Sequence, residues 1–133
     1  MVQMPERSRA ARILLADDDP DTRELYGFIL RSHGFDVVEA ADGGSAMQEL
    51  TEHPPDLVIT DLRMPGIDGF EICRASSALP EPVPTIVVTA LATPAVVARA
   101  EAAGAEIVLF KPLSPTVVLE KVRERLKSRG FRV

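Results

Sequence analysis

Residues 58–69 have the sequence VITDLRMPGIDG, in which an apolar run ends in one carboxylate and a turn with proline and glycine follows. A short apolar run without polar alternation predicts a strand that is buried on both faces, as in a parallel sheet. Pro65 and Gly66 favour a turn soon after it. The segment therefore predicts that Asp61 stands alone at the tip of a buried strand.

Three other apolar runs also end in residues with useful chemistry. Residues 13–16 (ILLA) lead into Asp17 and Asp18, residues 86–88 (IVV) lead into Thr89, and residues 107–110 (IVLF) lead into Lys111. Amphipathic segments separate these runs, and such alternation predicts a parallel sheet covered by helices on both faces. Because ligands of these sheets bind beyond the carboxyl ends of the strands, we expect the acids, the hydroxyl and the ammonium to meet at one edge.

Five strands and five helices are predicted along the chain. The strands are expected at residues 12–16, 35–40, 57–60, 85–89 and 107–110, and the helices are expected to begin near Asp19, Asp42, Asp68, Thr93 and Ser114. Proline directly after the cap supports three of these starts. The second strand alternates apolar and acidic residues, which is typical of a sheet edge. Three prolines in residues 79–84 predict a loop.

The length of 133 residues suits one domain with one core. We place this domain at residues 12–129, with tails at 1–11 and 130–133. The apolar runs are too short to cross a membrane, and the first residues lack the apolar centre of a secretory signal. A single cysteine, Cys73, excludes an internal disulfide and fits the cytoplasm. The net charge of −5 disfavours direct binding to nucleic acid.

Three carboxylates at one edge repel one another, and protons, Lys111 or a hard divalent cation can relieve the repulsion. Mg²⁺ fits best, because it prefers oxygen ligands and is commonly held by one or two carboxylates together with phosphate oxygens. A carboxylate beside Mg²⁺ can attack a phosphoryl group and form an acyl phosphate. Asp61, alone on its tip, is the predicted nucleophile, while Thr89 and Lys111 can bind phosphoryl oxygens.

The remaining acids and both histidines have simpler interpretations. Asp19, Asp42 and Asp68 stand where helices are predicted to begin, so they are interpreted as caps or turn residues. His33 and His53 lie near the C-terminal ends of predicted helices, where they face solvent or the helix dipole. It is the joint placement of acids, hydroxyl and lysine that indicates a functional site.

Four separated motifs make residues 12–127 resemble the receiver domain of two-component response regulators. They are ADDDP at residues 16–20, DLRMPG at 61–66, VTA at 88–90 and FKP at 110–112. The resemblance implies a flavodoxin-like α/β fold, a doubly wound sheet of five parallel strands in the order 2-1-3-4-5 with five helices. It also implies a regulatory domain that catalyses only its own phosphorylation and dephosphorylation.

By this resemblance, Asp61 accepts a phosphoryl group from a sensor histidine kinase or a histidine phosphotransfer protein. Mg²⁺ is then bound directly by Asp18, by Asp61 and by the backbone carbonyl of Arg63, and through water by Asp17. A downstream protein is expected to bind the face formed by the fourth helix, the fifth strand and the fifth helix. No direct contact with nucleic acid or a membrane is expected.

The resemblance also assigns roles to Thr89, as the switch hydroxyl, and to Lys111, as the cation that follows the phosphate, with a cis peptide bond before Pro112. One position departs from the family. An aromatic residue often lies three positions before the lysine, and this chain has Val108 there. We therefore expect activation to move mainly the segment that follows Thr89.

Two other functions use similar residues. An aspartyl-phosphate phosphohydrolase would need a second carboxylate two residues after its nucleophile, where this chain has Arg63, and a cap domain that the sequence does not provide. An adaptor module that no longer depends on phosphorylation would not need the complete set of acids, hydroxyl and lysine. Uptake of a phosphate mimic such as beryllofluoride with Mg²⁺ separates these possibilities.

Overall fold

The computed structural model describes residues 9–91 and 93–133, and it contains one parallel sheet of five strands. The strands are β1 (Arg12–Ala16), β2 (Asp36–Ala40), β3 (Leu57–Thr60), β4 (Thr85–Thr89) and β5 (Ile107–Phe110). Their order is β2-β1-β3-β4-β5, as predicted, and β2 is an edge strand. The final residue of β1, Ala16, pairs with Ala40 of β2 and with Thr60 of β3, so these three strands end side by side.

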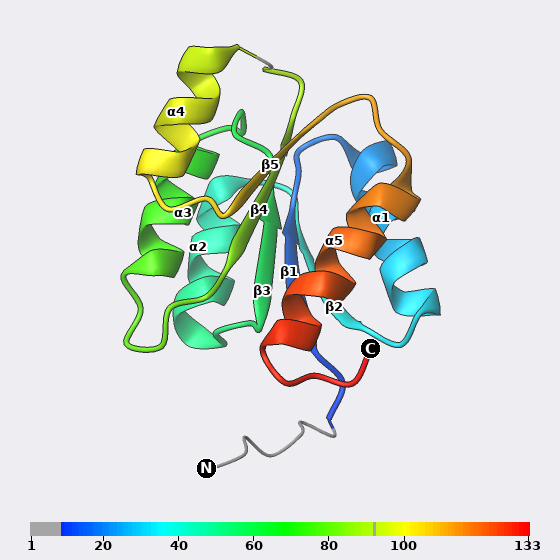
Figure 1. Ribbon diagram of the computed structural model, residues 1–133. Helices are drawn as coiled ribbons and strands as arrows, with labels where there is room; N and C mark the ends of the chain where they lie inside the picture. Colours follow the sequence, from blue (N-terminus) through cyan, green and yellow to red (C-terminus); the bar gives the residue numbers. More distant parts are fainter. Residues whose placement is uncertain (1–8, 92) are drawn as a thin grey trace.

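Helices cover both faces of the sheet, which confirms the doubly wound α/β fold. They are α1 (Pro20–Ser32), α2 (Gly43–Glu52), α3 (Gly69–Ser77), α4 (Pro94–Ala102) and α5 (Pro115–Ser128). Helices α1 and α5 lie on one face, and α2, α3 and α4 lie on the other (Figure 1). Because β3 and β4 are buried along their whole length, the sheet itself forms the centre of the core.

The predicted helix starts are confirmed, with one difference in detail. The side chains of Asp42, Asp68, Thr93 and Ser114 each accept a hydrogen bond from a backbone N–H in the first turn of the helix that follows. Asp19 holds the same position before α1, but its carboxylate accepts a hydrogen bond from the Thr22 hydroxyl and makes no such backbone bond. The predicted position of this cap is therefore right, although its bonding differs.

The two histidines have the structural positions predicted for them, and Cys73 is a buried thiol. Cys73 is buried on α3, and burial raises the pKa of its thiol to about 12. His33 and His53 follow the ends of α1 and α2. Among the described residues, none of the helices is long and apolar enough to cross a membrane.

Both ends of the described chain are tied to the domain. Arg9 donates two hydrogen bonds to the carboxylate of Asp56, which also accepts one from the backbone N–H of Arg12. Burial opposes the ionised form of Asp56, but these donors outweigh it and lower the pKa of the carboxyl. Phe131, within the tail predicted for 130–133, is 3% exposed and packs into the core. Residues 1–8 of the other predicted tail lie outside the described residues.

Candidate functional site

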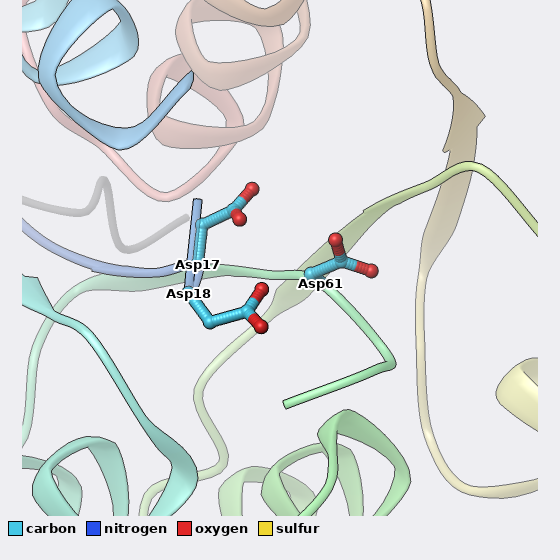
Figure 2. Close-up of side chains that lie close together, drawn as sticks. All are labelled: Asp17, Asp18 and Asp61. Carbon is cyan, nitrogen blue, oxygen red and sulfur yellow. The ribbon is translucent and has the colours of Figure 1, made fainter. Parts of the chain in front are cut away.

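The acidic cluster forms because β1 and β3 are neighbours that end at the same level. Asp17 and Asp61 each follow the last residue of their strand, and the backbone N–H of Asp61 donates to Ala16 at 3.0 Å. Asp18 comes next after Asp17, and one carboxylate oxygen from each of the three acids lies within 4.8 Å of the others. The side chains of Asp17 and Asp18 extend from the end of β1 towards Asp61 (Figure 2).

Lys111 joins two of these carboxylates. Its Nζ lies 2.8 Å from Asp17 Oδ2 and 2.8 Å from Asp61 Oδ2. Burial favours the neutral amine, but the two carboxylates outweigh this and raise the pKa of Lys111, which is therefore charged at neutral pH. The peptide bond between Lys111 and Pro112 is cis, as predicted.

Asp17 is the most buried of the three acids. Its Oδ1 accepts from the backbone N–H of Asp19 at 2.9 Å, and its Oδ2 accepts from Lys111. Burial raises the pKa of Asp17 above its usual value, although Lys111 and the Asp19 N–H act in the opposite direction. Asp18 is exposed, so the two adjacent carboxylates differ strongly in their access to water.

Asp61 combines a fixed orientation with access to solvent. Its Oδ1 accepts hydrogen bonds from the backbone N–H groups of Leu62 at 2.6 Å and Arg63 at 3.4 Å. Its side chain is 12% exposed, which makes it more accessible than Asp17 at 4%. The turn after β3 therefore holds one oxygen of Asp61, while Lys111 binds the other.

Thr89 lies at the same edge of the sheet, at the end of β4. It pairs in register with Phe110, and Lys111 donates its backbone N–H to the Thr89 carbonyl at 2.8 Å. The Thr89 side chain is buried, and its Oγ1 accepts from the backbone N–H of Leu91 at 3.2 Å. The roles predicted for Thr89 and for the carbonyl of Arg63 stay predictions.

Arg23 was not among the residues predicted for the site, yet it contacts the acidic cluster directly. Its Nη1 donates to the carbonyl oxygen of Asp17 at 2.7 Å, and its Nε lies 3.4 Å from Glu39 on β2. The available signal in the sequence was the spacing of Arg23, Gly27 and Arg31 at intervals of four residues, which places them on one face of a helix.

The chemistry of the donors fits a small hard cation. The carboxylates of Asp17, Asp18 and Asp61 offer oxygen ligands that are close enough to share one ion. Mg²⁺ prefers such ligands and tolerates a site in which water or phosphate completes the coordination shell. The same acids, with a lysine beside them, can place negative and positive charge around a phosphoryl group.

Comparison with known proteins agrees with this geometry. The family model of the response regulator receiver domain matches residues 13–123. The DNA-binding response regulator MtrA of Mycolicibacterium smegmatis is 37% identical over 116 residues, which cover 87% of this chain and 50% of MtrA. The chain thus spans about half the length of that relative.

Two solved structures extend the similarity to the fold. A CheY-like receiver domain protein from Methanospirillum hungatei JF-1 superposes with a TM-score of 0.84 at 28% identity, covering 90% of this chain and 95% of that one. The chemotaxis response regulator CheY4 of Vibrio cholerae gives a TM-score of 0.80 at 28% identity, with 86% and 98% covered.

Proposed function

The chain belongs to the response regulator receiver domain family, and on this premise we propose that it is a phosphorylation-dependent receiver in which Asp61 is the phosphoacceptor. The assignment rests mainly on one observation: the ammonium of Lys111 donates hydrogen bonds to both Asp17 and Asp61, at 2.8 Å each. The phosphodonor is a phosphohistidine of a sensor kinase or of a phosphotransfer protein. Asp17, Asp18, Asp61 and the carbonyl of Arg63 would hold Mg²⁺, with Asp17 acting through water.

In the proposed reaction an oxygen of Asp61 forms a bond to phosphorus while the bond from phosphorus to the histidine nitrogen breaks. The imidazole leaves with the bonding electron pair, and Asp61 becomes an aspartyl phosphate. Mg²⁺, when bound, neutralises charge on the phosphoryl oxygens. The backbone N–H groups of Leu62 and Arg63 keep Asp61 oriented. The ammonium of Lys111 bonds to the Asp61 carboxylate and can bond to a phosphoryl oxygen once the phosphate is attached.

The output of the proposed switch is a protein contact. Thr89 can turn its hydroxyl from Leu91 towards a phosphoryl oxygen, which changes the segment that joins β4 to α4. This segment leads into the face formed by α4, β5 and α5, the proposed surface for a downstream protein. MtrA is named as a DNA-binding protein, but for this chain we propose neither nucleic acid nor a membrane as a direct partner. We place it in the cytoplasm, where Cys73 stays reduced.

Phosphoryl uptake that depends on Mg²⁺ is the first test of this function. On incubation with acetyl phosphate and Mg²⁺, intact mass should show one phosphoryl group per chain, and a chelator present from the start should prevent it. The metal is needed because three carboxylates at one site repel the incoming phosphate. A phosphorylation-independent adaptor would show no adduct, and a phosphohydrolase would release phosphate continuously without a lasting adduct.

A second prediction concerns which segment changes conformation when the site is activated. Val108 is partly buried and packs against the core cluster that includes Ala100 and Ala103, where it provides no aromatic ring that could swing inward. Activation should therefore appear mainly in the segment after Thr89. Amide exchange measured with and without beryllofluoride should change most in residues 90–99, of which residue 92 lies outside the described structure. Changes confined to α5, residues 115–128, would contradict this.

A third prediction concerns the lifetime of the aspartyl phosphate. Arg63 and Leu91 each lie two residues beyond a site residue, and their backbone N–H groups bond to Asp61 and Thr89. Neither side chain can orient water as a base, so the phosphorylated form should be long-lived. Combining Arg63→Asn with Leu91→Glu should speed hydrolysis about tenfold, equivalent to about 1.4 kcal/mol in the barrier.

Release of phosphate from labelled protein measures this rate. Arg74→Asn is the matched control for the lost arginine charge, because Arg74 is exposed on α3 outside the site. The control should release phosphate at the wild-type rate. An unchanged or slower rate in the double variant would show that Arg63 and Leu91 do not control the access of water.

A further inference from the structure

A partly buried ion pair links α1 to the edge strand β2 beside the acidic cluster. Arg23, Gly27 and Arg31 lie on one face of α1, and Glu39 of β2 packs across that face between the two arginines. Glu39 Oε1 lies 3.4 Å from Arg23 Nε, and Oε2 lies 2.7 Å from Arg31 Nη1. Gly27 provides the space, since a Cβ there would come within 3.1 Å of Glu39 Oε2. An alanine in place of Gly27 would have to displace the Glu39 carboxylate by a few tenths of an ångström.

Of the two arginines that bind Glu39, Arg23 is the one that also contacts the acidic cluster. Its Nη1 donates to the carbonyl oxygen of Asp17 at 2.7 Å, and its side chain is only 16% exposed. Pairing between β1 and β2 ends at Ala16 and Ala40, with one further bond from the Asp17 N–H to the Ala40 carbonyl. The Asp17 carbonyl thus lies beyond the ladder, where a side chain serves as its donor.

Holding this carbonyl constrains both acids at the end of β1. The peptide bond is planar, so the oxygen of Asp17 lies in one plane with the nitrogen and Cα of Asp18. A donor that fixes the oxygen therefore fixes the point from which the Asp18 side chain leaves the chain. Asp18 is exposed, and the direction of its backbone is the main means of aiming it. Figure 2 shows both carboxylates directed towards Asp61.

We propose that Arg23, anchored by Glu39, is a positioning residue that holds the peptide between Asp17 and Asp18 so that the acidic cluster can bind Mg²⁺. This inference rests on the proposed function, because it takes the cluster as the Mg²⁺ site. Residues that orient metal ligands without touching the metal affect its affinity strongly. The arginine fork suits this task, since different nitrogens can bond to the Asp17 carbonyl and to Glu39.

The loss of the Arg23 charge alone and the loss of its positioning contact should change the Mg²⁺ affinity in opposite directions. Removing a positive charge near three carboxylates should tighten Mg²⁺ binding, whereas removing a positioning contact should weaken it. Arg31 is the matched control. It carries the same charge and shares Glu39, but its other bond is to the Val37 carbonyl at 2.8 Å and not to Asp17.

The experiment is a Mg²⁺ titration of the unphosphorylated protein, followed by amide chemical shifts, for the wild type, Arg23→Met and Arg31→Met. Arg23→Met should weaken Mg²⁺ binding about tenfold. Arg31→Met should stay within about twofold of the wild type, as expected for a half-exposed side chain that does not bond to Asp17. Arg23→Lys should recover part of the loss, since it keeps a donor but lacks the fork. Urea unfolding of each variant reports any general loss of stability.

Equal or tighter Mg²⁺ binding by Arg23→Met would overturn the inference, and so would equal losses in the Arg23 and Arg31 variants. If Arg23→Met does not fold, the same titration is made with Arg23→Lys and Arg31→Lys. Only Arg23→Lys should then weaken Mg²⁺ binding. A wild-type protein that does not bind Mg²⁺ would overturn the proposed function itself. A wild type that binds Mg²⁺ together with an unaffected Arg23→Met would overturn only the role of Arg23.

Discussion

Replacing Asp61 with asparagine is expected to abolish phosphoryl uptake from acetyl phosphate and Mg²⁺. The amide has no charged oxygen that could attack phosphorus, although its shape is nearly the same. Its Oδ1 can still accept from the N–H groups of Leu62 and Arg63, so the turn after β3 should keep its form. The amide nitrogen would face Lys111, which retains its bond to Asp17. Loss of activity should therefore come without loss of the fold.

Intact mass after incubation measures the uptake, and thermal unfolding checks that the variant is folded. Asp42→Asn is the matched control, because Asp42 caps α2 and asparagine caps a helix equally well. The control should be phosphorylated to the wild-type extent. An undiminished adduct on Asp61→Asn would show that another side chain accepts the phosphate.

The strand tips could be predicted because each is marked by an abrupt change in the sequence. Residues 57–59 and 107–110 are apolar, Asp61 and Lys111 follow closely, and the observed strands end at Thr60 and Phe110. Neighbouring parallel strands then bring their tips to one edge without any further information. The sequence thus predicted the composition of the cluster, while the bonds from Lys111 to Asp17 and Asp61 depend on side-chain positions that only the folded structure defines.

Contacts between residues that share no local pattern could not be predicted in the same way. The pair of Arg23 and Glu39 joins α1 to β2, and either residue alone is consistent with a solvated surface position. The hydroxyl of Thr22 competes for the Asp19 carboxylate, which replaces the expected backbone cap. Phe131 lies beyond the final helix, and only the packing of α5 shows that it enters the core. In each case a tertiary contact decides between alternatives that the local sequence permits.

Gly69 connects the stability of the domain to the position of the phosphoacceptor. It begins α3, and its N–H donates to the Leu62 carbonyl at 2.9 Å. A Cβ at this position would lie 2.1 Å from the Asp61 carbonyl oxygen and 2.7 Å from the Leu62 Cα. Both are backbone atoms that cannot rotate away. An added methyl group must therefore move the start of α3 away from the turn that holds Asp61.

Gly69→Ala should lower the free energy of unfolding by about 3 kcal/mol, the upper end of the usual cost of overpacking. Urea unfolding measures the loss, and phosphoryl uptake should fall with it because the turn after β3 shifts. Gly44→Ala is the control. Its Cβ would meet only Asp42 Oδ1 at 3.4 Å, an ordinary contact, and alanine favours the helix, so stability should be unchanged or higher. Wild-type stability in Gly69→Ala would mean that α3 does not pack against the backbone of Asp61 and Leu62.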